Sequence, residues 1–311
     1  MNVRAISIII SLAILTLLYW QIDFSDVIDV FLQAKLIWLC LGLLLVVPIT
    51  LLTAFRLTFL SMRSNKISYV DALKLILAAS VMNLVLPSKM GDLAKSVFIV
   101  KDKDLNYSKA LPLVVFEKMS DLLALLLWCV VGLLFLQNYS SFYVIILLVA
   151  SIFLAIGVLT IYSKPFTNVM ALLALFILPK RFSLTVRGFQ EGWYQAIDFI
   201  RKDRKKTWVL FLLSVFLWFL HLFQIWLFIF ALSPNVDLLV SLAITPIAIF
   251  AGLMPLSFSG IGTRDFAFIY FYSAYFSAAT GAALGILATL RYIIPAVVGI
   301  PFFSHYLNKI R

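Results

Sequence analysis

The chain has few charged residues for its 311-residue length, and this shortage excludes a water-soluble protein. Charged side chains make up 13% of it and hydrophobic ones 64%, with a mean hydropathy of +1.08. One soluble domain could not bury so much apolar surface in its core. We therefore predict an all-α polytopic membrane protein that forms a single domain over residues 1–311.

Residues that carry metal or nucleophile chemistry are also scarce. The two cysteines, Cys40 and Cys129, fall within apolar segments without histidine or cysteine neighbours at ligand spacing, so we interpret them as packing residues. The sequence lacks a phosphate-binding ATP loop, a paired histidine and acid motif, an aspartate cluster at metal spacing and a nucleophile elbow. We expect no cofactor, no metal and no enzymatic reaction.

Six apolar segments are long enough to cross ~30 Å of hydrocarbon as helices that rise about 1.5 Å per residue. The first is followed by no small-residue cleavage site, so we expect a retained anchor and not a secretion signal. The six segments lie near residues 5–20, 36–60, 110–137, 142–162, 207–232 and 280–303.

Two more apolar stretches are interrupted in the same way, by a proline, a small polar loop, a glycine and then charge. The interruptions span residues 87–92 and 255–265, and the shorter apolar arms that follow span 93–100 and 266–279. Irregular backbone and charge at membrane depth are tolerated only inside protein or around a wet cavity. We therefore expect two broken, re-entrant helical hairpins that meet around a polar path.

The distribution of lysine and arginine predicts the orientation. The segment 163–206 is strongly basic, so by the positive-inside rule we expect a cytoplasmic connector, with both termini in the cytoplasm of a cell-membrane protein. The hairpins then enter from opposite faces, as in an inverted repeat of about 36–162 and about 207–303. The apolar run 166–178 is interpreted as interfacial, and a crossing there would reverse everything after it.

The net charge of +11 is explained by the connector, and no nucleic-acid partner is expected. Anionic lipid headgroups attract basic side chains by about 1 kcal/mol each near the surface. Docking of a specific partner on the connector and homo-oligomerisation both stay open.

Charged residues within the apolar segments are the candidate site. Glu117 and Asp121 are four residues apart and share a helix face, next to Lys118. Each charge at mid-membrane costs roughly 2.5–3.5 kcal/mol, so these side chains should not face lipid. They form either a salt-bridged cluster that holds helices together or the wall of a cavity that binds a headgroup. Arg56 is expected to snorkel to the cytoplasmic surface, and His221 to be buried and neutral.

The two hairpin loops could form a phosphate site. Arginine and lysine bind oxyanions, glycine allows close approach of backbone N–H groups, and a helix that starts after glycine directs its positive end at the anion. The predicted substrate-binding residues are Lys89, Asp92, Lys95, Glu117, Lys118, Asp121, Ser257, Ser259, Thr263, Arg264, Asp265 and Arg291.

Three ordered blocks carry a family resemblance: 86–92 with Lys95, 116–121, and 255–265 with its Ser-Gly-Ile-Gly core. Together they resemble the lysylphosphatidylglycerol synthase transmembrane family, also called flippase-like, and the flippase domain of multiple-peptide-resistance proteins. The resemblance implies a lipid translocase. The aminoacyl transferase fused to that domain is not expected here, since the chain stops at Arg311. Lys95 and Lys118 stand where the family pattern suggests arginine, which leaves the headgroup preference open.

The expected function is transfer of a charged or phosphate-bearing lipid headgroup between leaflets without ATP hydrolysis, either passive or ion-coupled. The cargo would be an anionic, aminoacylated or polyprenyl-linked lipid. Two alternatives stay open: a membrane-embedded enzyme that acts on lipid phosphates through Glu117 or Asp121, and a non-transporting scaffold that recruits a lipid-modifying synthase through the connector.

Overall fold

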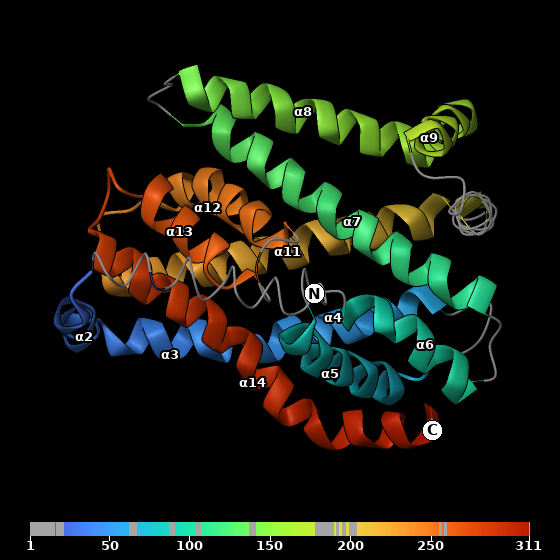
Figure 1. The fold of residues 1–311 in the computed structure, drawn as a ribbon, viewed down its shortest axis with the longest axis horizontal. Helices are drawn as coiled ribbons and strands as arrows, with labels where there is room; N and C mark the ends of the chain where they lie inside the picture. The colour runs from blue at the N-terminus through green and yellow to red at the C-terminus, as the bar shows by residue number, and fades with distance from the viewer. Residues whose placement is uncertain are drawn as a thin grey trace.

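The computed structural model describes residues 22–61, 67–86, 91–103, 107–136, 141–177, 204–254 and 260–310, with a few isolated positions between them. Every regular element in these ranges is a helix (Figure 1). The predicted all-α architecture is confirmed. The elements are α2 (Phe24–Gln33), α3 (Leu36–Leu44), α4 (Val46–Ser61), α5 (Tyr69–Val85), α6 (Gly91–Lys103), α7 (Tyr107–Leu134), α8 (Ser141–Tyr162), α9 (Lys164–Ile177), α11 (Arg204–Leu232), α12 (Leu238–Leu253), α13 (Thr263–Phe271) and α14 (Ala278–Ile310).

Four described helical segments are long and apolar enough to cross a bilayer: Leu36–Ser61, Ser141–Ile161, Thr207–Leu232 and Ala278–Leu307. The chain is therefore a multi-pass membrane protein. The regular helix of the first of these segments is interrupted at Leu45, between α3 and α4. Pro48 follows three residues later and has no N–H for the carbonyl of residue 44, which explains why the helix is interrupted there.

Helix α7 is also long enough to span, because its 28 residues cover about 42 Å. It differs from the other four by carrying Glu117, Lys118 and Asp121 within its length. The predicted segment 5–20 lies outside the described residues, apart from position 16.

The two interrupted stretches form the helix pairs α5–α6 and α12–α13. In Figure 1 the α12–α13 pair lies toward the left of the bundle and the α5–α6 pair toward the right. Helix α5 packs mainly on α14, and α12 packs mainly on α7. Each broken pair therefore packs on a long helix that belongs to the other part of the chain.

The predicted second arm 266–279 was too long. Helix α13 ends at Phe271, and a turn over residues 272–277 leads into α14. The turn was not predicted because its residues are largely apolar. It is held by packing: Tyr272 is fully buried, and its hydroxyl shares a hydrogen bond with Thr245 of α12 at 2.8 Å.

The connector begins with a helix. After Ser163, α9 turns away from the direction of α8 in Figure 1. Its 14 described residues cover about 21 Å, and Phe176 and Leu172 are exposed. The interfacial position predicted for 166–178 stays a prediction.

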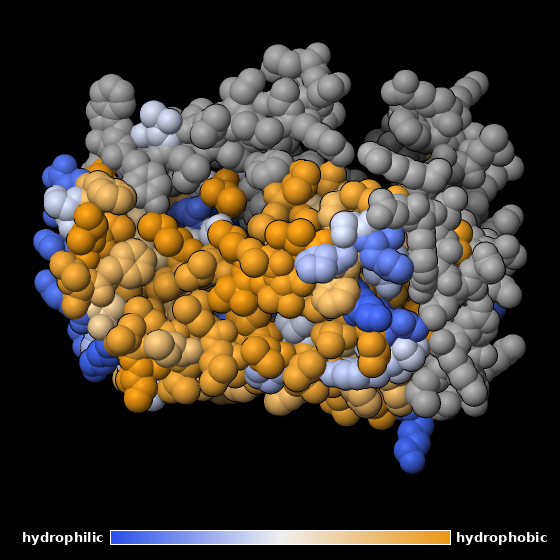
Figure 2. All heavy atoms as spheres, turned by 90° about the horizontal axis from the view of Figure 1, so that it is seen from below, coloured by the Kyte–Doolittle hydropathy of each residue, from blue (hydrophilic) through white to orange (hydrophobic). Residues whose placement is uncertain are grey.

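The outside of the bundle is largely apolar. Figure 2 shows a broad hydrophobic face, with hydrophilic residues at the left end and in a smaller area toward the right. Helix α8 is the most exposed spanning helix, with Ile145, Leu148 and Phe153 each more than half exposed. Such side chains are stable only against lipid or another apolar surface.

Candidate functional site

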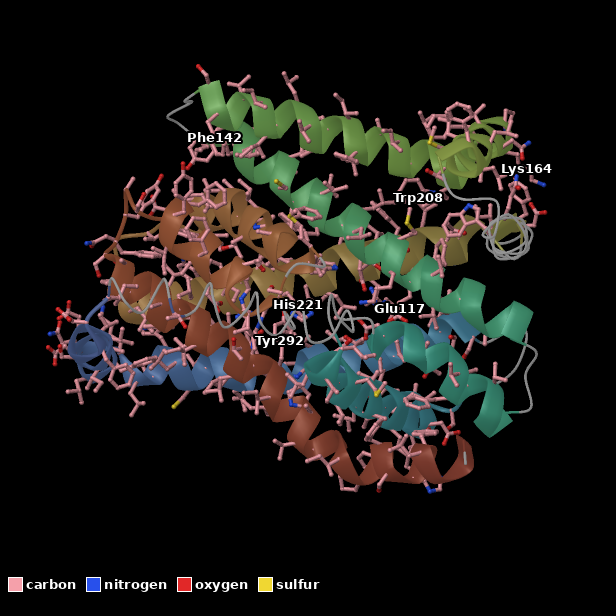
Figure 3. The ribbon with its side chains drawn as sticks, in the orientation of Figure 1. Glu117, Phe142, Lys164, Trp208, His221 and Tyr292 are labelled. Atoms are coloured by element: carbon pink, nitrogen blue, oxygen red, sulfur yellow. The ribbon has the colours of Figure 1, made fainter. Side chains whose placement is uncertain are left out.

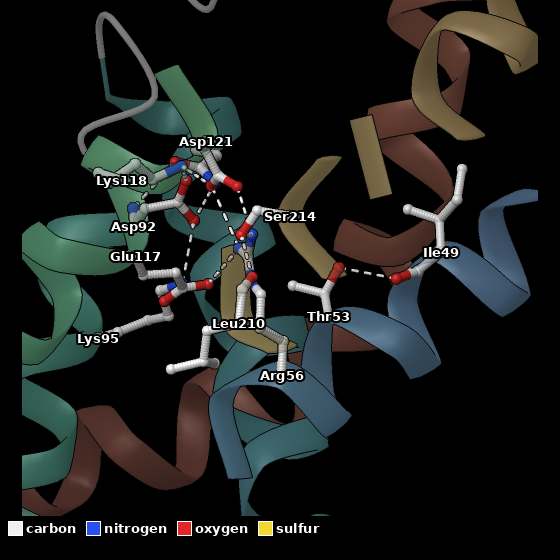
Figure 4. Close-up of polar contacts among 11 residues, drawn as sticks. Ile49, Thr53, Arg56, Asp92, Lys95, Glu117, Lys118, Asp121, Leu210 and Ser214 are labelled. Atoms are coloured by element: carbon white, nitrogen blue, oxygen red, sulfur yellow. Dashed lines mark hydrogen bonds and ion pairs between the residues drawn. The ribbon is translucent and has the colours of Figure 1, made fainter. Parts of the chain in front are cut away.

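An ion-pair network joins α4, α6 and α7 inside the bundle (Figure 4). Arg56 of α4 donates to Glu117 Oε1 at 3.0 Å and to both carboxylate oxygens of Asp121, and it also donates to Ser214 Oγ of α11 at 3.0 Å. Arg56 is 4% exposed and Glu117 3%. The predicted snorkelling of Arg56 was therefore wrong, because two carboxylates on α7 hold its guanidinium inside the protein.

Helix α6 contributes the second part of the network. Lys95 donates to Glu117 Oε2 at 2.8 Å and lies 3.8 Å from Asp92. Lys118 pairs with Asp92 and lies 3.8 Å from Asp121. Among the described residues, three cations and three carboxylates thus form one neutral group, which reduces the cost of burying each charge.

Asp92 is held at the start of α6 by the end of α5. Asn83 donates to Asp92 Oδ1 at 3.0 Å, and its own Oδ1 accepts from the Asp92 backbone N–H at 3.1 Å. A Cβ on Gly91 would collide with the backbone of Met82 and Asn83. Only glycine allows the two helices to approach so closely, and this approach brings Asp92 to the network.

The network forms one wall of a cavity of about 370 Å³. Its other walls come mainly from α5, α11, α14 and the first turns of α4. In Figure 3, Glu117, His221 and Tyr292 all lie toward the centre of the bundle, whereas Lys164 lies at its edge. The volume falls in the range of about 300–1,000 Å³ found for small-molecule sites. The polar lining residues are Thr50, Thr53, Arg56, Ser80, Asn83, Asp92, Lys95, Glu117, Lys118, Asp121, His221, Gln224, Arg291 and Tyr292.

Arg291 is the cation on the far wall. It donates to the His221 carbonyl and to Gln224 Oε1, both at 3.3 Å, and to the Tyr292 hydroxyl at 2.5 Å. Its side chain is 3% exposed. Gln224 in turn donates to the Gly42 carbonyl at 2.7 Å, so its acceptor oxygen is turned toward Arg291.

The second broken pair uses its charges differently. Arg264 of α13 donates to Asp265 Oδ1 at 2.8 Å, to the Gly285 carbonyl at 3.1 Å and to Thr289 Oγ1 at 2.6 Å. Asp265 Oδ2 accepts from the Gly262 N–H at 3.0 Å. Both charges are buried against α14, and neither lines the cavity.

A small-residue motif on α14 makes this contact possible. Gly281 and Gly285 are four residues apart, and a Cβ on Gly285 would lie 2.8 Å from the Asp265 carboxylate. A Gly-xxx-Gly spacing allows close helix packing in membranes. This spacing is visible in the sequence and could have indicated where α13 packs.

The predicted site residues fall into three groups. Lys89 and Ser259 lie outside the described residues. Ser257 and Thr263 share a hydrogen bond of 2.6 Å and, like Arg264 and Asp265, lie away from the cavity lining, so a headgroup-binding role for these four stays a prediction. The six that line the cavity are Asp92, Lys95, Glu117, Lys118, Asp121 and Arg291.

Sequence reasoning missed several lining residues, among them Asn83, Thr53 and Gln224. Each is an uncharged polar residue within an apolar run, and outside the hairpin loop 255–265 only charged residues were chosen as candidates for the binding site. Within the described ranges, no group of three His, Cys, Asp or Glu side chains is arranged to hold a metal ion.

Comparison with known proteins adds one finding. A family model described as "Lysylphosphatidylglycerol synthase TM region" matches residues 4–299, nearly the whole chain. No curated protein sequence matches the chain closely enough to add a relative.

Proposed function

Because the chain belongs to the lysylphosphatidylglycerol synthase transmembrane family, we propose that it is a lipid translocase. The family fits a membrane lipid-related role, and we propose in addition that the protein transfers the lipid between leaflets. The cargo would be a lipid with a charged or phosphate-bearing headgroup, either anionic, aminoacylated or polyprenyl-linked, carried between leaflets without ATP hydrolysis.

The observation that supports this proposal most is the charged cavity inside an otherwise apolar bundle. A headgroup crosses a bilayer slowly because its charge must leave water for hydrocarbon. The cavity offers buried cations, carboxylates and hydroxyls that replace hydration. At the same time, apolar lining residues such as Leu122, Leu217 and Leu253 offer a path for the first carbons of the acyl chains.

The two broken helix pairs suggest how access could alternate. We propose that α5–α6 and α12–α13 are re-entrant hairpins of an inverted repeat that enter from opposite faces of the cell membrane, with both termini in the cytoplasm. Rocking of one repeat against the other would then open the cavity to each leaflet in turn. Pro295, which lines the cavity, and Pro301 both lie inside α14. They remove backbone hydrogen bonds and provide points where that helix can bend.

The test is a leaflet assay with purified protein in liposomes. A fluorescent phosphatidylglycerol is placed in both leaflets, and dithionite reduces only the outer-leaflet dye. We expect wild-type protein to make the inner pool reducible, whereas Thr53→Phe should slow this by filling the cavity without changing its charge. Val149→Phe, on the exposed side of α8, is the matched control and should behave as wild type.

Each outcome has a defined meaning. Wild-type protein that transfers no lipid faster than empty liposomes would contradict the translocase. A chemically altered lipid, detected by mass spectrometry of the same liposomes, would support the membrane-embedded enzyme instead. Transfer that Thr53→Phe leaves unchanged would separate the activity from this cavity.

A further inference from the structure

Among the described residues that line the cavity, Arg291 is the one cation without a carboxylate partner. Arg56, Lys95 and Lys118 each contact at least one of the carboxylates Asp92, Glu117 and Asp121, so the network is neutral. No carboxylate of a described residue lies within 4.0 Å of Arg291. This side chain therefore gives the described lining of the cavity a net positive charge.

The partners of Arg291 in the described part of the chain are all neutral. They are a backbone carbonyl, the Gln224 amide oxygen and the Tyr292 hydroxyl, and the Tyr292 ring also packs 4.6 Å from the guanidinium carbon. Its buried Nε has no hydrogen-bond partner among the described residues. A guanidinium has five N–H donors in a planar fork, and a buried charge is unfavourable unless it is paired. Arg291 is thus a buried cation with unused donor capacity that faces a polar cavity.

By contrast, Arg264 shows what a neutralised buried arginine looks like in this fold. Its charge is matched by Asp265 at 2.8 Å, and its other donors reach two backbone carbonyls and a threonine hydroxyl. Arg264 is as buried as Arg291, with both 3% exposed. The two arginines are therefore equally buried. They differ because Arg264 has a carboxylate partner, whereas Arg291 has none among the described residues and faces the cavity.

We infer that Arg291 is the binding site for a single oxyanion, the phosphodiester of the lipid that enters the cavity. This inference rests on the proposed function and deepens it: the substrate class is a phospholipid whose phosphate supplies the missing counter-charge. The neutral network on the opposite wall then contacts the polar substituent beyond the phosphate. Free phosphate carries the same chemistry, and the experiment separates the two sources.

Binding is measured on purified protein in detergent, independently of transfer. The midpoint of thermal unfolding is followed during titration with phosphatidylglycerol in mixed micelles, with inorganic phosphate, and with a diacylglycerol that lacks phosphate. We expect phosphatidylglycerol to raise the midpoint and diacylglycerol to leave it unchanged. Removal of a charge-assisted contact in Arg291→Gln should weaken phosphatidylglycerol binding about 10- to 100-fold.

The matched control is Arg264→Gln, which removes an equally buried arginine outside the cavity. It should lower the unfolding midpoint without ligand, because it leaves Asp265 unpaired, but it should keep the phosphatidylglycerol-dependent rise. Should Arg264→Gln not fold, Arg291→Lys serves instead: it keeps the charge but loses the fork, and it should bind with intermediate affinity. Arg291→Gln itself should be no less stable than wild type in the absence of lipid, since it removes an uncompensated charge.

The outcomes distinguish this inference from the proposed function. If only phosphatidylglycerol raises the unfolding midpoint, the site is assigned to lipid. If inorganic phosphate raises the midpoint by a comparable amount, the site is assigned to a free anion and the lipid assignment is overturned. Equal phosphatidylglycerol binding by wild type and Arg291→Gln overturns the inference, even where lipid transfer is observed. Arg291-dependent binding without any leaflet transfer leaves the inference standing and removes the translocase.

Discussion

The buried pair Lys95–Glu117 gives the sharpest test of the ion-pair network. Its atoms are 2.8 Å apart, and both side chains are 2% exposed. Removal of one member of a buried pair costs about 3–5 kcal/mol, because the other charge is left without compensation. Glu117→Gln should reach this range, since Lys95 would keep only Asp92 at 3.8 Å. Lys95→Met should cost less, because Glu117 would keep Arg56 at 3.0 Å.

The double variant Lys95→Met with Glu117→Gln should be more stable than the sum of the single losses predicts. We expect a coupling free energy of about 1–3 kcal/mol for residues in one network. The free energies of unfolding are measured by titration with dodecyl sulfate in detergent. The exposed pair Lys164–Asp198, at 3.1 Å, is the control and should couple by less than about 1 kcal/mol. Equal coupling in both pairs would refute the conclusion that the network is buried.

Three further substitutions test the packing that positions the cavity, each by the same unfolding titration. Asn83→Ala should cost about 1–3 kcal/mol, because the Asp92 backbone N–H and carboxylate both lose a buried partner, and a loss near zero would contradict the α5–α6 link. Gly262→Ala should destabilise α13, because Gly262 has φ of 94°, which disfavours side chains; unchanged stability would contradict that backbone. Gly299→Ala should separate α14 from α5, since its Cβ would meet the Leu77 carbonyl oxygen, and wild-type stability would refute that contact.

The helical architecture was readable from the sequence because its signals are local. Long apolar runs predicted the spanning helices, and the proline, glycine and charge at 87–92 and 255–265 predicted that α5–α6 and α12–α13 would be interrupted. The interruption at Leu45 was missed, although Pro48 indicates it. The end of α13 was missed because Tyr272 is apolar enough to continue the run, and only its packing on α12 makes it a turn residue.

The site was only partly readable because charge placement depends on tertiary contacts. Glu117 and Asp121 were expected to point into the protein, and both contact Arg56 there. That partner could not be identified, because a guanidinium near a helix end can reach either water or a neighbouring helix. Arg264 was grouped with the cavity on the basis of its charge, whereas the close approach of α14 at Gly285 provides it with carbonyl partners elsewhere.

The central claim is that the charged cavity is a hydrated path within the bundle, and the most direct test is the reactivity of single cysteines. In a chain without Cys40 and Cys129, Ser80→Cys places a thiol in the cavity lining, and Ala78→Cys places one two residues away in the apolar core. The measurement is the rate of labelling by a charged, water-soluble thiosulfonate in membrane vesicles. The account predicts that Ser80→Cys reacts and Ala78→Cys does not. Equal failure of both to react, in folded protein, would contradict it.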